Sequence, residues 1–199
     1  MDVVIVGITN MGSRVCVGAL SLDDWSSLRL TDGDLHGWSP SEQFIIGDVW
    51  KIRGSKITDC RPPHVEDFSV SFSRRIGPYT SDLKQDIIDN VNNIAHGGFH
   101  ALYQGCLHRN STGTHCIKES CVPAWSTQFW LPSMRLTHDI NNPKPHYTTQ
   151  ISSIGYVGRA AAIDVIPARS LVRVSLARWW APVPTVDEAC YLQISGWWL

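Results

Sequence analysis

The chain has 199 residues, of which 43% are hydrophobic and 18% are charged, and its formal net charge is −1. This length and composition allow a buried core, so disorder is excluded and one sizeable domain or two small ones are expected. The balanced charge excludes a broad electrostatic grip on nucleic acid, so any such binding must be local or depend on base stacking.

The N-terminal stretch MDVVIVGITN is apolar but short, and it has no basic region of the kind that begins a signal peptide. No stretch of the sequence reaches the roughly 18 apolar residues of a membrane helix. We therefore expect a cytoplasmic protein with no membrane partner. In that compartment the six cysteines are expected to be free thiols.

The first part of the chain has the patterns of several short strands. Residues 3–8 are a β-branched run, and residues 14–20 follow after a turn, so the two predict a β-hairpin. The glycines between them lack the GxGxxG spacing, and a strand rather than a helix follows, which excludes a dinucleotide-binding start. Alternation over 45–54 and 68–75 adds further strands. About five strands within the first 75 residues are typical of a small barrel.

One amphipathic helix is predicted over residues 80–98, with Gly97–Gly98 at its end. Its apolar positions form one stripe: Leu83, Ile87, Ile88, Val91 and Ile94. The acidic residues on the other side are interpreted as a solvated face rather than a catalytic set.

The C-terminal region returns to strand patterns after a less regular stretch over 99–150. Residues 170–180 alternate, with Val172 and Val174 on one face and Arg173 on the other, and residues 190–199 are the expected partner strand. Together they predict a C-terminal hairpin. The order of a β-rich region, a helix and a second β-rich region suggests two similar units.

Four motifs carry a resemblance to a known family. They are RPPHVED at 61–67, preceded by IIGDVWKI, STQFWLP at 126–132, LVRVSLARWW at 171–180 and CYLQISGWW at 190–198. Together with the N-terminal hairpin they resemble the bacterial dual OB-containing domain proteins, over nearly the whole chain from residue 3.

The resemblance implies a mainly β fold of two tandem OB-like barrels with one main helix between them. The boundaries expected from it are 1–78 for the first barrel, 79–98 for the connecting helix and 99–199 for the second barrel. It also implies recognition of nucleic acid or a nucleotide-like ligand, in prokaryotic defence contexts. No catalytic residues follow from it.

Candidate ligand contacts come from aromatic and basic residues, because OB-type surfaces hold single strands by stacking and a local basic groove. Of nine tryptophans, two adjacent pairs lie at the ends of the terminal hairpin strands, with one side chain of each pair on either face. The segment WSTQFW is either a binding loop or a packed strand. The connector held stiff by Pro62–Pro63 either contacts a ligand or braces a corner. The candidates are Arg61, His64, Trp125, Trp130, Arg173, Arg178 and Trp179.

A metal site is weighed against unrelated thiols and loop histidines. The pattern C-x-H-x6-H-C-x4-C contains residue types that bind zinc, but its spacing matches no standard zinc pattern. Its members are Cys106, His108, His115, Cys116 and Cys121. The sequence therefore predicts no metal and no cofactor, with zinc binding by this group left open.

Catalysis is the remaining alternative. His64, Glu66 and Asp67 could serve a nuclease or nucleotide-processing enzyme, although two-metal chemistry usually gathers carboxylates from several elements. A cysteine–histidine pair is a further option. We expect no catalytic residue and a recognition module for nucleic acid, single-stranded rather than duplex, or for a nucleotide. An effector protein is a possible partner, and a protein–protein adaptor in a defence complex is the other alternative.

Overall fold

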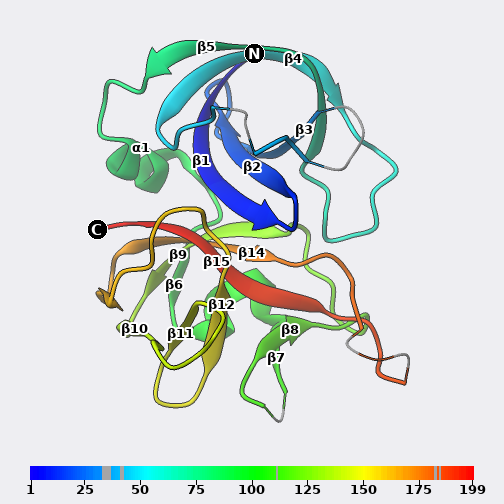
Figure 1. The fold of residues 1–199 in the computed structure, drawn as a ribbon, viewed down its shortest axis with the longest axis vertical. Coiled ribbons are helices and arrows are strands. Elements are labelled where there is room, and N and C mark those ends of the chain that lie inside the picture. The colour runs from blue at the N-terminus through cyan, green and yellow to red at the C-terminus, as the bar shows by residue number, and fades with distance from the viewer. Residues whose placement is uncertain (33–36, 41–42, 111, 182, 184) are drawn as a thin grey trace. The chain divides into compact units, whose positions relative to one another are not determined.

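The computed structural model divides into two compact units, one of Met1–Arg61 with Val65–Asn92 and one of Pro62–His64 with Asn93–Leu199. Both consist mainly of strands (Figure 1), which confirms the predicted mainly β class. The structure describes the whole chain except residues 33–36, 41–42, 111, 182 and 184. Within the described residues, no helix is long and apolar enough to cross a membrane.

The first unit is a closed barrel of five strands in the order β1-β2-β3-β5-β4. β3 and β5 pair in parallel, and the other neighbours are antiparallel. The strands are β1 (Asp2–Met11), β2 (Arg14–Ser21), β3 (Ser27–Thr31), β4 (Asp48–Lys56) and β5 (Asp67–Pro78). The predicted N-terminal hairpin and the predicted number of strands are both confirmed.

The barrel closes around a core of alternating apolar side chains from every strand, including Val3, Val17, Leu30, Ile52 and Phe68. The pairing of β4 with β5 is interrupted by two bulges, one of them between Arg53 and Gly54. At this bulge the two backbones approach so closely that a Cβ on Gly54 would lie 1.9 Å from the Ser69 carbonyl oxygen. Only glycine fits there.

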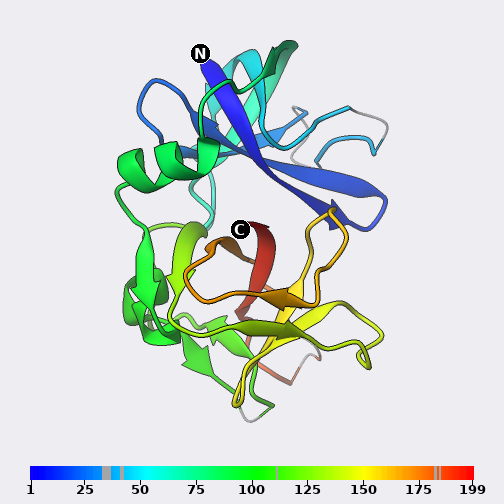
Figure 2. The same ribbon diagram turned by 90° about the vertical axis from the view of Figure 1, so that its left-hand side faces the viewer.

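The single α-helix of the described residues, α1 (Leu83–Asn90), follows the barrel strands and is the green coil at the upper left of Figure 2. The Asp82 side chain caps it by accepting a hydrogen bond of 3.1 Å from the Gln85 backbone N–H. The prediction of helix through residue 98 is wrong, because Val91 is already extended and β6 (Ala95–Gly97) pairs in parallel with β9 (Thr127–Pro132). The helix belongs to the first unit, and β6 to the second.

The second unit is built on a ten-stranded sheet rather than on a second five-stranded barrel. Its path runs β13-β10-β11-β12-β15-β14-β9-β6, and β8 joins β15 and β7 beside that path. A 3-10 segment, η1 (Phe99–Gly105), follows β6. The other strands are β7 (His108–Arg109), β8 (His115–Ile117), β10 (Leu136–His138), β11 (His146–Thr148), β12 (Ser153–Tyr156), β13 (Val165–Ile166), β14 (Leu171–Leu176) and β15 (Cys190–Trp198).

The predicted C-terminal hairpin is confirmed, since β14 and β15 pair antiparallel from Leu171 opposite Trp198 to Leu176 opposite Leu192. β14 also pairs with β9 on its other side, so it is a central strand. The face that carries Arg173 is consequently buried as well as the face that carries Val172 and Val174.

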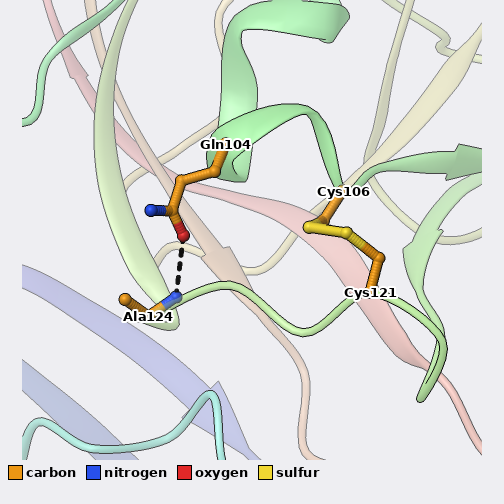
Figure 3. The surroundings of a disulfide bond; sticks show 4 residues. All are labelled: Gln104, Cys106, Cys121 and Ala124. Atoms are coloured by element: carbon orange, nitrogen blue, oxygen red, sulfur yellow. Dashed lines mark hydrogen bonds between the residues drawn. A yellow bond between two sulfur atoms is a disulfide. The ribbon is translucent and has the colours of Figure 1, made fainter.

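A disulfide joins Cys106 and Cys121, whose Cα atoms lie 5.3 Å apart (Figure 3). The expectation of six free thiols is therefore wrong for this pair, and it holds for Cys16, Cys60, Cys116 and Cys190. Two of the five candidate zinc ligands are used in the disulfide and cannot bind metal. Disulfides are typical of oxidising compartments, so this bond weighs against the expected cytoplasmic location.

Candidate nucleic-acid interface

The outward side of the β4–β5 pair carries exposed cations on neighbouring positions. Lys51 lies opposite Arg74, and Arg53 lies opposite Phe72. Ile52, between the two β4 cations, is buried in the barrel core, so alternation turns Lys51 and Arg53 outward. All four side chains are exposed. We call Lys51, Arg53, Phe72 and Arg74 the β4–β5 outer surface.

A guanidinium and an aromatic ring lie together on this surface. The Arg53 Cζ atom is 5.5 Å from the centroid of the Phe72 ring, within the range of a cation–π interaction. The Phe72 side chain nevertheless remains 45% exposed. A large apolar ring left this open on a strand is free to stack against a planar group of a ligand.

The charges of the surface are only partly neutralised. The Lys51 ammonium lies 3.6 Å from an Asp2 carboxylate oxygen, a separation at which an exposed pair is weak. Among the described residues, neither Arg53 nor Arg74 has a carboxylate within ion-pair distance. Two arginines are thus open to an anionic partner.

Arg75, the neighbour of Arg74, is occupied by an acid. Its guanidinium donates two hydrogen bonds to the carboxylate of Asp48, at 2.6 and 2.9 Å. These hydrogen bonds and the charge of Asp48 raise the pKa of Arg75. This bidentate pair leaves Arg75 little capacity to bind a phosphate.

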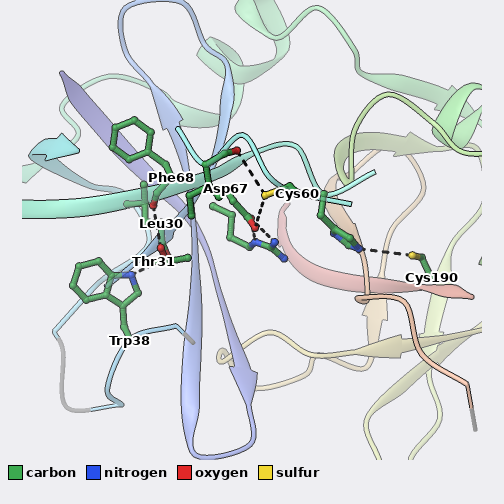
Figure 4. Close-up of polar contacts among 10 residues, drawn as sticks. Leu30, Thr31, Trp38, Cys60, Asp67, Phe68 and Cys190 are labelled. Atoms are coloured by element: carbon green, nitrogen blue, oxygen red, sulfur yellow. Dashed lines mark hydrogen bonds and ion pairs between the residues drawn. The ribbon is translucent and has the colours of Figure 1, made fainter. Parts of the chain in front are cut away.

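The arginines of β2 and β3 are also paired with acids. Arg14 donates to the Asp32 carboxylate at 2.7 Å. Arg29 forms an ion pair with the buried Asp67, and Asp67 is labelled in Figure 4. The uncompensated positive charge of the barrel strands therefore lies on β4 and β5 rather than on β2 and β3.

The Pro62–His64 segment, predicted either to bind ligand or to brace a corner, is held within the second unit. The Trp179 indole N–H donates a hydrogen bond of 2.7 Å to the Pro62 carbonyl. His64 is fully buried, and its Nε2 lies 3.7 Å from the sulfur of Cys190, which is labelled in Figure 4. These contacts favour the bracing role for Pro62–His64.

Two further predicted ligand contacts are buried. Arg173 is 5% exposed and donates to the Ser195 hydroxyl at 2.9 Å. Trp130 is 0% exposed, and its indole N–H donates to the Gly97 carbonyl at 2.9 Å. Because β9 and β14 lie inside the sheet, burial argues against ligand contact by either residue and supports the packed-strand interpretation of WSTQFW.

The other candidates differ in exposure. Arg61 and Arg178 are exposed, while Trp125 and Trp179 are partly buried and pack against the core of the second unit. Ligand contact by these four residues stays a prediction.

The catalytic alternatives find little support in the geometry. Of the predicted His64, Glu66 and Asp67 cluster, His64 contacts Cys190, whereas Asp67 pairs with Arg29 and accepts a hydrogen bond from Cys60. Burial and the charge of Asp67 raise the pKa of the Cys60 thiol. A reactive cysteine needs a lowered pKa, so Cys60 is poorly suited to act as a nucleophile.

The second cysteine–histidine pair is no better activated. Burial raises the pKa of Cys116 and lowers the pKa of His115, so both groups are held neutral at neutral pH. His115 instead shares a hydrogen bond of 3.0 Å with the Ser152 hydroxyl.

No protein-family model matches the chain, and no curated protein matches it. The resemblance to the dual OB-containing domain proteins stays a prediction that depends on the four motifs.

Sequence reasoning passed over the β4–β5 outer surface. The signal was present, because KIR in β4 and SFSRR in β5 place cations and a phenylalanine at outward positions of alternating strands. The register that sets them opposite one another was not readable from either strand alone.

Proposed function

We propose that the first unit binds single-stranded nucleic acid through the β4–β5 outer surface. The observation that carries the proposal is the presence of two uncompensated arginines, Arg53 and Arg74, beside the exposed ring of Phe72. Guanidinium groups bind phosphates, and an open aromatic ring stacks with bases of any sequence. A single strand offers both groups along its length, whereas a duplex hides its bases.

The fold supports this proposal. A closed five-stranded barrel with its third and fifth strands parallel is the arrangement of an OB fold, and OB folds bind oligonucleotides. Such folds often use strands 2 and 3 for binding. Here the arginines of those strands are paired with Asp32 and Asp67, so we assign the role to β4 and β5.

Recognition without catalysis is the role that we propose, within the prokaryotic defence setting that the resemblance implies. In that setting an effector protein would use the bound strand. The alternative of a protein–protein adaptor differs in one measurable property, because only a nucleic-acid binder loses oligonucleotide affinity steeply as salt rises.

The proposal is tested by fluorescence anisotropy with labelled single-stranded DNA, single-stranded RNA and duplex DNA at two salt concentrations. The full chain is compared with the Arg53→Ala/Arg74→Ala double variant. We expect single strands to bind more tightly than duplex, and the double variant to lower the slope of log affinity against log salt by about 0.7 per lost phosphate contact.

A control for loss of charge elsewhere is Lys84→Gln, which removes one positive charge from α1 in the same unit. It should leave affinity nearly unchanged. If no oligonucleotide binds, or if the double variant binds as tightly as the unaltered chain, the proposal fails.

A further inference from the structure

The second unit contains a pocket of about 580 Å³ at the edge formed by η1, β10 and the β11–β12 turn. Its volume lies within the range of small-molecule sites, which is roughly 300–1,000 Å³. Phe99, Met134 and Ile151 supply an apolar part of its wall. Arg135, Thr137 and Gln150 supply polar groups beside it. The pocket thus offers both a surface for a ring and groups for a polar substituent.

Aromatic rings pack behind the apolar wall of the pocket. The Phe99 ring stacks on the His115 ring, with centroids 4.2 Å apart and planes inclined by 17°. The centroid of the Trp130 ring lies 5.4 Å from the centroid of the Phe99 ring. His115 is buried and shares a hydrogen bond with the Ser152 hydroxyl, so the Phe99 ring packs against a positioned side chain. Phe99 itself is only partly buried, so a planar ligand in the pocket would continue the stack.

Several polar side chains of the pocket wall have hydrogen-bonding groups that are available to a ligand. Within the described residues, the side chains of Arg135, Thr137 and Gln150 make no hydrogen bond or ion pair. Thr149 accepts from the backbone N–H of Ser152 at 3.1 Å, which leaves its hydroxyl proton for another acceptor. Arg135 is the only charged residue of the described lining, so the pocket favours an anion.

We propose that this pocket binds a nucleoside monophosphate or a close analogue, a planar heteroaromatic ring that carries a phosphate. The ring stacks on Phe99, Thr137 and Gln150 recognise its polar edge or sugar, and the Arg135 guanidinium binds the phosphate. The pocket is a second site and lies in the other unit from the β4–β5 outer surface, so it does not depend on the proposed strand binding.

Isothermal titration calorimetry of the full chain tests the assignment with four probes: AMP, CMP, adenosine and inorganic phosphate. We expect AMP and CMP to bind, adenosine to bind at least about tenfold more weakly because it lacks the phosphate, and phosphate alone to bind least. Phe99→Leu keeps apolar bulk but loses the stacking face, and we expect about tenfold weaker AMP binding. Arg135→Gln should remove the preference for AMP over adenosine.

Thermal melting of each variant shows whether it remains folded, and Arg135→Gln, at an exposed position, serves as the variant least able to disturb the core. No heat with AMP or CMP at millimolar concentration would overturn the inference. So would AMP affinity that is unchanged in both folded variants. AMP binding that disappears instead in Arg53→Ala/Arg74→Ala would overturn the pocket while leaving the proposed strand binding intact.

Discussion

The Trp179 indole N–H donates a hydrogen bond of 2.7 Å to the Pro62 carbonyl, across 117 positions of the chain. The bond connects RPPHVED with LVRVSLARWW, two of the four motifs that carry the family resemblance. The hydrogen bond gives both motifs a structural role within the second unit. Trp179 therefore contributes to the packing of the second unit.

This hydrogen bond leads to a first prediction. Trp179→Phe keeps the apolar ring but removes the donor, and it should lower the free energy of unfolding by about 0.5–1.5 kcal/mol. Urea denaturation followed by circular dichroism measures the change. Trp180→Phe is the control, because Trp180 is 56% exposed and should have a smaller effect. Equal stability of the two variants would contradict this structural role of Trp179.

The exposed ring of Phe72 gives a second prediction. If bases stack on it, Phe72→Ala should weaken single-strand binding by about 1–3 kcal/mol. The salt dependence should stay the same, because no phosphate contact is lost. Anisotropy titrations measure both quantities. Phe72→Tyr keeps the ring and should retain affinity, and Ile76→Ala removes a comparably exposed apolar residue from the same strand and should have little effect. A Phe72→Ala variant that binds normally would exclude stacking at this position.

The close approach of strands at Gly54 gives a third prediction. A methyl group there would lie 1.9 Å from the Ser69 carbonyl oxygen and 2.7 Å from a Phe68 ring carbon. Gly54→Ala should therefore destabilise the barrel by about 1–3 kcal/mol, the usual cost of overpacking. Chemical denaturation provides the measurement. Gly155→Ala, whose nearest neighbour would be 3.8 Å away, should be tolerated. A stable Gly54→Ala barrel would mean that the strands are farther apart.

Burial of His115 gives a fourth prediction, about pH. Burial lowers the pKa of His115 in the folded chain from its ordinary value of 6.5. The unfolded chain therefore binds the proton more readily, so stability is full above about pH 6.5 and falls as pH drops below it. Urea midpoints at pH 7.5 and 5.5 should show this loss. In His115→Gln the loss should shrink, whereas His100→Gln, at an exposed histidine, should keep it. The same pH response in His115→Gln would assign it to other groups.

The disulfide gives a fifth prediction. Alkylation of the denatured chain without reductant should label four cysteines, and alkylation after reduction should label all six, as mass spectrometry can count. Because the bond closes a loop of 15 residues, Cys106→Ser/Cys121→Ser should cost about 3 kcal/mol of stability. Cys16→Ser, at a cysteine outside the disulfide, is the control. Six labelled cysteines without reductant would show that the bond is absent.

Local patterns were sufficient for much of the fold. The N-terminal hairpin, the five strands of the barrel and the pairing of β14 with β15 all follow from runs and alternation within short segments. The helix was only half correct, because Ala95–Gly97 pairs with a strand more than thirty residues later. An amphipathic pattern cannot register such a partner, and tertiary pairing overrides local propensity.

The candidate sites were less accessible to prediction. Alternation indicates that β4 and β5 carry outward cations. It does not indicate that Arg75 is neutralised by Asp48, whereas Arg74 has no such partner among the described residues. The pocket lined by Phe99 is formed by η1, β10 and the β11–β12 turn, so no single stretch of sequence predicts it. The Cys106–Cys121 bond likewise depends on the path of the chain after η1.

By itself, then, the sequence determined the strand-rich character of the protein, because side-chain alternation is a property of each strand alone. It also identified Pro62–Pro63 as a stiff connector, since proline restricts its own backbone. Only the tertiary structure decided which arginines lie beside a carboxylate, which tryptophans are buried and which cysteines form a disulfide. Those outcomes depend on distances between residues far apart in the chain, and such distances exist only once the chain has folded.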